Sequence, residues 1–285
     1  GITQGRYPSR IPVMIPTYSL YQISMLHDLY WYREDDEFIK SYLPSIRNIL
    51  EYYESFLDEK HLLKNLEWWQ YVDAAYPRGI PPGTNDGNSA MQTLLYVYTM
   101  QQAIDLFEHF GWQHEADKWK KQEERIKSAV NEYCFVPEKE LYAETPEKEN
   151  FAQHTNIFSI LTNTAPEEKQ QEIMQKVIAD TSLLQTRLFF NFYFFRALKK
   201  SGLAHLYFDH LDTWYGMLDY GYTTCGEWGN LETDRSDCHA WSATPVFDYM
   251  NILLGIDASK PGFKEVEVKP TFGKLDQLKG SFPHP

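Results

Sequence analysis

The chain has 285 residues, of which 43% are hydrophobic and 16% aromatic, and its formal net charge is −13 at pH 7. This length suits one large domain, and the Lys and Arg residues are too scattered for a nucleic-acid groove. No apolar run is long enough for a membrane span, and no signal-peptide core opens the sequence.

The first third of the chain predicts two helices of different character. After a proline-punctuated entry over residues 8–16, the run 17–32 is apolar on most faces and predicts a buried helix. The acidic run 35–37 is typical of a helix start, because carboxylates favour the positive end of the helix dipole. Apolar residues then recur at steps of three and four over 36–57, so this helix is expected to bury one face.

The middle of the chain combines a long loop with two further helices. Residues 63–88 contain two tryptophans, Asp73 and a run of Pro and Gly, and they predict an irregular segment. Residues 89–110 predict a helix buried nearly all round, whereas 113–131 predict a helix with one wet face. A hairpin is expected over 133–142 and a strand over 263–268. Further helices are expected over 151–161, 187–200, 203–218 and 240–254, and another is expected to start at residue 164.

Helices buried nearly all round thus alternate with helices that have one wet face. Two concentric rings explain this alternation, and we predict an all-α fold, an (α/α)6 toroid with a short C-terminal β segment. About nine helices are expected where a closed toroid of six pairs needs twelve, so the toroid is predicted to be incomplete. Residues 1–258 would form it, and residues 259–285 would form the β segment.

The predicted loops differ at the two ends of the toroid. Loops that enter the inner helices are long and rich in aromatic and acidic residues, whereas loops that leave them are tight. Ligand sites belong on the elaborated end of a rigid scaffold. The long loops are 7–16, 63–88, 142–150 and 219–239, and the tight ones are 111–112, 162–165 and 201–202.

The stretch 222–241 lies on this rim and is the best candidate for chemistry. Its Glu227 stands between a glycine, which admits a ligand closely, and Trp228, which lowers the local polarity. With Asp73 on another long loop, two carboxylates could serve one site, as glycosidic-bond hydrolysis usually requires. Alternatively the stretch is a solvated acidic turn, and Asp73 caps a helix or pairs with Arg78.

Other side chains on the rim could bind a neutral sugar, which suits an acidic protein. His239 could donate a hydrogen bond to a substrate hydroxyl, although a structural role is the common case. Trp68, Trp69 and Trp228 offer flat faces for stacking on a sugar ring, with core packing as the alternative. His154 and Asp86 are weaker candidates.

The sequence gives no sign of a cofactor or a metal. It contains no phosphate-binding glycine loop, no Gly-x-Ser-x-Gly and no His-Glu-x-x-His, and its three cysteines lack metal-ligand spacing. We therefore expect no cofactor and no metal site. Cys225 and Cys238 could meet across the stretch 222–241, but buried free thiols are the favoured expectation.

Several motifs together resemble the catalytic region of the bacterial α-L-rhamnosidases, glycoside hydrolase family 78. They are TTCGEWGN around Glu227, CHAWSATP at 238–245, LGIDASKPGFKEVEVKP at 254–270, RYPSR at 6–10, WWQYVDA at 68–74 and the DGNSAMQTLLYVY helix. The resemblance runs through essentially the whole chain. It implies an (α/α)6 barrel that hydrolyses terminal α-L-rhamnosides with inversion.

The resemblance also implies roles for single residues. Glu227 matches the general base that activates water, and Asp73, Trp69 and His239 match positions that line the rhamnose pocket. The family's general acid would lie in a segment before the first residue of this chain, and its C-terminal β-sandwich would begin in the tail. Ala74 stands where many members have Trp, so this part of the pocket wall differs.

We therefore expect a partial catalytic domain with a carbohydrate substrate and little or no hydrolytic activity by itself. Two classes of alternative stay open. One is another (α/α)6 glycosidase or a sugar epimerase, which would share the site at the rim. The other is a carbohydrate-binding scaffold without catalysis.

Overall fold

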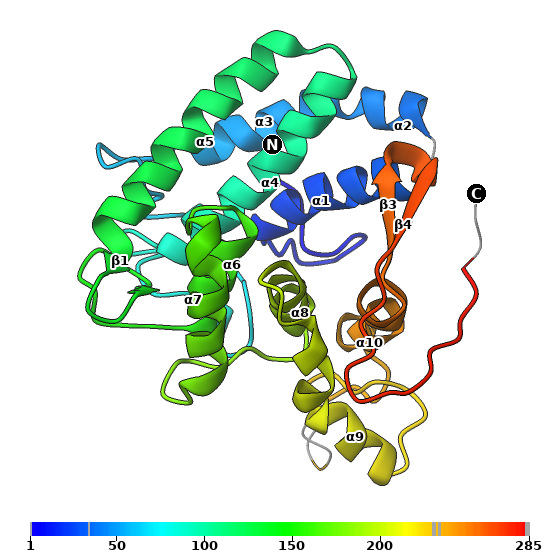
Figure 1. The fold of residues 1–285 in the computed structure, drawn as a ribbon. Helices are drawn as coiled ribbons and strands as arrows, with labels where there is room; N and C mark the ends of the chain where they lie inside the picture. Colours follow the sequence, from blue (N-terminus) through cyan, green and yellow to red (C-terminus); the bar gives the residue numbers. More distant parts are fainter. Residues whose placement is uncertain (1, 34, 230–231, 233–234, 283–285) are drawn as a thin grey trace.

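Five helices form the inner layer of the computed structural model, which describes residues 2–33, 35–229, 232 and 235–282 (Figure 1). They are α1 (Thr17–Tyr32), α4 (Ala90–His109), α6 (Gln153–Leu161), α8 (Asn191–Lys200) and α10 (Thr244–Asp248). Successive inner helices pack against each other, α1 on α4, α4 on α6, α6 on α8, and α8 on α10. Almost every residue of α6 and most of α4 are buried, as expected for helices surrounded by others.

The outer layer is made of helices that bury one face. They are α2 (Asp36–Ser41), α3 (Leu43–Glu54), α5 (Gln113–Cys134), α7 (Glu167–Ala179), the 3₁₀ helix η2 (Ala204–His210) and α9 (Asp212–Asp219). In α5 the buried side chains recur at helical spacing, while Lys and Glu occupy the other face. α3 and α5 pack on α4, α7 packs on α6, and η2 packs on α8.

The predicted fold class is confirmed. Inner and outer positions alternate along the chain as in an α/α toroid. The described residues fill five inner and four outer positions, since α2 with α3, and η2 with α9, each occupy one outer position. The bounds of α1 agree with the predicted 17–32, because its apolar pattern begins directly after Pro16 and the chain turns extended at Arg33.

Three predicted helices are interrupted, each for a local reason. The helix expected over 36–57 breaks at Tyr42, and Pro44 starts α3 in its first turn, where proline needs no hydrogen-bond acceptor. The helix expected over 187–200 begins only at Asn191, since residues 188–190 form a turn before it, and the Arg187 N–H donates to the Asp73 carboxylate. The run 203–218, with Tyr, Phe, Asp and His at its centre, divides into η2 and α9.

The last inner position is also irregular. Instead of one helix over 240–254, the chain forms a short 3₁₀ turn η3 (Ala240–Ser242), α10, and a π-helical turn η4 (Tyr249–Leu253). Pro245 lies in the first turn of α10 and prevents a continuous helix from η3 onward. The Trp214 indole on α9 donates to the Ser242 carbonyl at 2.7 Å, which fastens the entry of α10 to the outer layer.

Two short antiparallel hairpins accompany the helices. β1 (Phe135–Val136) pairs with β2 (Leu141–Tyr142), as the sequence predicted for 133–142. β3 (Ile256–Lys260) pairs with β4 (Glu265–Val268), and the 3₁₀ turn η5 (Pro261–Phe263) between them packs on α1. The strand predicted over 263–268 is therefore shorter, and β3 begins two residues before the predicted boundary at 258.

All three cysteines are free thiols, but they differ in exposure. Cys134 is buried, Cys225 is half-buried and Cys238 is exposed, so the expectation of buried thiols was wrong for Cys238. The two lie in a surface stretch whose backbone pairing, described below, turns Cys238 outward. No described helix combines the length and apolarity that crossing a bilayer requires.

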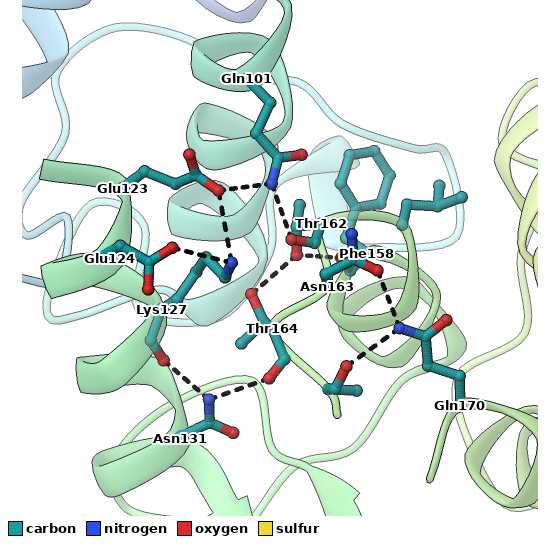
Figure 2. A network of polar contacts seen from close by, with 12 residues as sticks. Gln101, Glu123, Glu124, Lys127, Asn131, Phe158, Thr162, Asn163, Thr164 and Gln170 are labelled. Carbon is teal, nitrogen blue, oxygen red and sulfur yellow. Dashed lines mark hydrogen bonds and ion pairs between the residues drawn. The ribbon is translucent and has the colours of Figure 1, made fainter. Parts of the chain in front are cut away.

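A dense polar network fastens the loop between α6 and α7 (Figure 2). The Gln101 amide on α4 donates to Glu123 on α5 at 2.7 Å and to the Thr162 carbonyl at 2.8 Å. The Gln170 amide on α7 donates to Asn163 Oδ1 at 3.0 Å and to the Ala165 carbonyl at 3.1 Å. The loop therefore connects four helices by hydrogen bonds, and its conformation is fixed from several sides.

Candidate functional site

Three loops that precede inner helices surround one cavity of about 520 Å³. The segments are the N-terminal arm before α1, the loop before α4, and the stretch before η3 and α10. All enter from the same end of the toroid, which is the elaborated end predicted from the loop lengths. The lining residues are Gly5, Arg6, Val13, Ile15, Tyr18, Trp69, Tyr71, Ala74, Tyr76, Arg78, Gly79, Glu227, Trp228, Arg235 and Trp241.

Backbone pairing within the stretch 222–241 determines where Glu227 lies. The Glu227 N–H donates to the Ser236 carbonyl at 2.9 Å, and the His239 N–H donates to the Cys225 carbonyl at 2.8 Å. The Trp241 indole donates to the Glu227 carbonyl at 2.8 Å. Glu227 is thus held on both sides of its backbone, and only 1% of its surface is exposed.

The Glu227 carboxylate forms an ion pair with Arg235 directly across this pairing. Arg235 Nε donates to Oε2 at 3.0 Å, and Nη2 donates to Oε1. The carboxylate in turn raises the pKa of the Arg235 guanidinium. His239 Nε2 lies 4.0 Å from Oε1, so an imidazole stands beside the same carboxylate oxygen.

Aromatic side chains form much of the cavity wall. Trp69 and Trp228 line it with 42% of their surface exposed, and the Arg235 guanidinium lies over the Trp228 ring, 5.6 Å from its centroid. Tyr71 and Trp241 stack with ring centroids 6.4 Å apart and planes within 3° of parallel. The Trp69 indole donates to the Arg78 carbonyl at 2.9 Å and its ring meets that of Tyr71 nearly at right angles, with centroids 5.5 Å apart, so its orientation is fixed.

Asp73 lies behind this wall and is fully buried. Its Oδ2 contacts His154 Nε2 at 2.7 Å and accepts from the Arg187 N–H at 2.9 Å. Its Oδ1 is buried without a hydrogen-bond partner, and so is Nδ1 of His154. Asp73 therefore neither caps a helix nor pairs with Arg78, and it keeps one acceptor unused.

A second buried carboxylate adjoins Asp73. Glu144 accepts hydrogen bonds from the Tyr76 hydroxyl at 3.0 Å and from the Thr155 hydroxyl. Burial raises the pKa of Glu144, and these hydrogen bonds offset the rise only in part. The Tyr76 ring lies 4.6 Å from that of His154, so the two carboxylates and the imidazole form one polar cluster, the Asp73–Glu144 cluster, beneath the cavity.

The predicted site residues come together only in part. Glu227, Trp69 and Trp228 line the cavity, while His239 and Asp73 adjoin it without lining it. Trp68 lines a neighbouring cavity of about 460 Å³ instead, and Asp86 is exposed. His154, rated a weaker candidate, is the partner of Asp73.

Sequence reasoning missed the arginine and tyrosine residues of the site. Arg235 stands in the stretch that the sequence singled out, but nothing in a single sequence indicates which carboxylate it pairs with. Arg78 was considered only as a partner of Asp73, and Tyr71 was not considered. No periodic pattern in the loop indicates Tyr71, because the chain turns where the Tyr71 N–H donates to the Trp69 carbonyl at 2.9 Å.

Other parts of the described chain offer less for chemistry. A cavity of about 590 Å³ beside the β1–β2 hairpin is lined by Lys139, Phe151, Lys176 and neighbours, without a buried carboxylate. Within the described ranges, no three His, Cys, Asp or Glu side chains gather as a group that could hold a metal ion.

Comparison with protein families gives one match across most of the chain. Residues 4–251 match the family model described as the bacterial alpha-L-rhamnosidase 6 hairpin glycosidase domain. No curated protein sequence matches the chain.

Solved structures with the same fold are larger proteins. A family 78 rhamnosidase of Bacillus sp. GL1 superposes with a TM-score of 0.85 at 23% identity, over 94% of this chain and 30% of that one. A rhamnosidase from Klebsiella oxytoca, solved with rhamnose bound, gives 0.71 at 20% identity, over 85% and 48%. The Streptomyces avermitilis α-L-rhamnosidase, complexed with L-rhamnose, gives 0.66 at 17%, over 87% and 24%. The chain thus spans less than half the length of each.

Proposed function

Because the chain belongs to the bacterial α-L-rhamnosidase six-hairpin glycosidase family, we propose that it takes part in hydrolysing terminal α-L-rhamnosides at the cavity beside Glu227. The observation that carries the proposal is a buried carboxylate opening on a cavity walled by aromatic rings. Carbohydrate sites combine ring faces for stacking with a few polar groups that orient hydroxyls.

We assign Glu227 the role of general base in an inverting reaction. Its carboxylate would take a proton from water as the water oxygen bonds to the anomeric carbon, and the bond to the leaving oxygen breaks on the opposite face. A second carboxyl group would protonate that leaving oxygen. Glu227 is the one carboxylate among the described lining residues, so we expect the acid to come from outside them.

Arg235 must release one oxygen of Glu227 before that oxygen can accept a proton from water. The release requires little unpacking, because 70% of the Arg235 side chain is exposed. Once Nη2 has moved away from Oε1, Nε can still hold Oε2 in place. The proposal therefore treats Arg235 as a residue that orients Glu227 before the sugar arrives.

The remaining residues would bind the sugar. Trp69 and Trp228 are partly exposed aromatic rings that could stack on a sugar, Trp228 once Arg235 has moved from its ring, and His239 can donate a hydrogen bond to a hydroxyl beside Glu227. Asp73 has one oxygen free to accept from a hydroxyl, provided the wall opens to it. Trp68 would contact the group attached to the rhamnose, since it lines the neighbouring cavity.

The proposal is tested with Glu227→Gln in the full-length gene product. Loss of a positioned base typically lowers kcat by about 10²–10⁴, while binding of L-rhamnose should persist. Glu232→Gln, an exposed acid of the same stretch, is the matched control. Normal turnover of an aryl α-L-rhamnoside by Glu227→Gln would contradict the assignment.

A carbohydrate-binding role without catalysis is the second candidate, favoured by the single carboxylate among the described residues that line the cavity. We predict that the 285-residue chain alone binds L-rhamnose but does not turn over an aryl α-L-rhamnoside. Turnover by the isolated chain would show that both proton-transfer groups are present in it.

A further inference from the structure

A second cavity of about 460 Å³ adjoins the one beside Glu227. Trp69 and Arg78 line both cavities, so the two share a wall. Trp68, Ile80 and Asn85 complete the lining of the second. A chain of two sugars could therefore place one ring in each cavity, with the shared wall beside the bond between them.

The charge around these cavities is opposite to that of the whole protein. Arg6, Arg78 and Arg235 line the first cavity and face a single acid, Glu227, which Arg235 already neutralises. No described carboxylate forms an ion pair with Arg6 or Arg78. In a chain with a net charge of −13, two guanidinium groups without an acidic partner among the described residues provide local attraction for an anion.

The backbone holds Arg78 and Trp68 in place at an energetic cost. Both have left-handed φ angles, 57° for Arg78 and 66° for Trp68, which residues with a Cβ adopt rarely. Hydrogen bonds enforce these turns: the Trp69 indole holds the Arg78 carbonyl, and the Asn85 amide donates to the carbonyls of Leu66 and Trp68. Strain that the surroundings enforce in this way is characteristic of ligand sites.

We propose that the second cavity is a subsite for an acidic sugar, a uronate, linked to the rhamnose that occupies the first. This inference rests on the proposed function for the identity of the first sugar. The planar Arg78 guanidinium matches a carboxylate in two parallel hydrogen bonds, and Trp68, 57% exposed, offers a face to the uronate ring. The class of substrate is thus an α-L-rhamnosyl uronate rather than a rhamnoside of a neutral sugar.

Calorimetric titration of the 285-residue chain tests the inference with four probes: L-rhamnose, methyl β-D-glucuronide, and two disaccharides of equal linkage, rhamnosyl-glucuronate and rhamnosyl-glucose. We expect the acidic disaccharide to bind about tenfold more tightly than the neutral one, as one charge-assisted contact would give. Added salt should reduce this preference, because the pair is partly exposed. Equal affinities for the two disaccharides would overturn the inference.

Variants identify the residue responsible. Arg78→Gln should remove the preference and Arg78→Lys should retain part of it, whereas Arg125→Gln on the outer helix α5 should preserve it after the same change of net charge. Trp68→Ala should weaken both disaccharides and leave L-rhamnose unchanged. A preference that persists in Arg78→Gln would assign the anion to another part of the protein and overturn the inference.

The single sugars separate this inference from the proposed function. If L-rhamnose fails to bind while methyl β-D-glucuronide binds in an Arg78-dependent manner, the proposed function fails and the acidic subsite stands. If L-rhamnose binds and Arg78 does not increase the affinity for either uronate probe, the proposed function stands and the acidic subsite fails. Thermal unfolding of each variant confirms that it is folded before its affinity is interpreted.

Discussion

Two buried polar clusters in this protein differ in how completely their atoms are bonded. In the network at the α6–α7 loop, no buried side-chain atom of Gln101, Thr162, Thr164 or Gln170 is left without a partner (Figure 2). In the Asp73–Glu144 cluster beneath the cavity, Asp73 Oδ1 and His154 Nδ1 have none. Thr162 and Gln170 are buried, as Asp73 and His154 are, so the difference is not one of burial.

A saturated network fixes a loop and has nothing left to offer a ligand. An unbonded buried acceptor costs free energy in the empty protein, and the cost is recovered when a donor reaches it. We therefore propose that the loop leaving α6 serves stability, whereas Asp73, in the loop entering α4, keeps one acceptor for a ligand. Three substitutions in the two polar clusters test this difference between them.

The largest effect is expected from Asp73→Ala. It leaves the Arg187 N–H and His154 Nε2 without their shared acceptor, which should lower the free energy of unfolding by about 3 kcal/mol. It also removes the unused oxygen, so the affinity for L-rhamnose should fall about 30-fold. Denaturant unfolding and calorimetry measure the two effects. Unchanged affinity in a folded Asp73→Ala protein would mean that Asp73 is structural only.

A smaller and purely structural effect is expected from Gln170→Ala. It leaves Asn163 Oδ1 and the Ala165 carbonyl without a donor and should lower the free energy of unfolding by about 2 kcal/mol. The affinity for L-rhamnose should not change once the protein is folded. Loss of affinity comparable to that of Asp73→Ala would remove the distinction between the two clusters.

The smallest effect concerns pH and Glu144. Burial raises the pKa of this carboxyl above its ordinary value of 4.5, so the folded protein holds the proton more tightly than the unfolded chain. Its stabilising contribution is therefore complete below pH 4.5 and is lost as pH rises through the folded pKa. Relative to Glu144→Gln, whose amide cannot ionise, the natural protein should lose stability as the pH rises above 4.5. Parallel stability curves for the two proteins would contradict this.

The sequence predicted the architecture because the architecture depends on periodic burial. The helix over 17–32 and the alternation of inner and outer helices follow from apolar spacing, which a single sequence displays directly. Contacts between distant residues are not displayed in this way. Pro44 could have been read as a helix start, but the contact between the Arg187 N–H and Asp73, 114 residues apart, could not.

The candidate site was predictable in its location but not in its pairing. Long aromatic and acidic loops indicated the rim, and the stretch 222–241 does bring Glu227 to the cavity. Which residue faces Glu227 depends on the register in which this stretch folds back, with Ser236 opposite Glu227. That register places Arg235 on the carboxylate, and no periodic pattern in the stretch encodes it.

Two small residues in the loop before α4 set different limits on redesign of the cavity. A Cβ at Gly79 would overlap the Tyr71 ring, and φ at Gly79 is +76°, so this position must stay glycine if the Tyr71–Trp241 wall is to be kept. Ala74 also lines the cavity, but its side chain is a single methyl group on an exposed residue. A library that varies Ala74 and holds Gly79 constant would therefore change the depth of the cavity without moving its aromatic wall, which makes Ala74 the first position to diversify when a different sugar is to be accommodated.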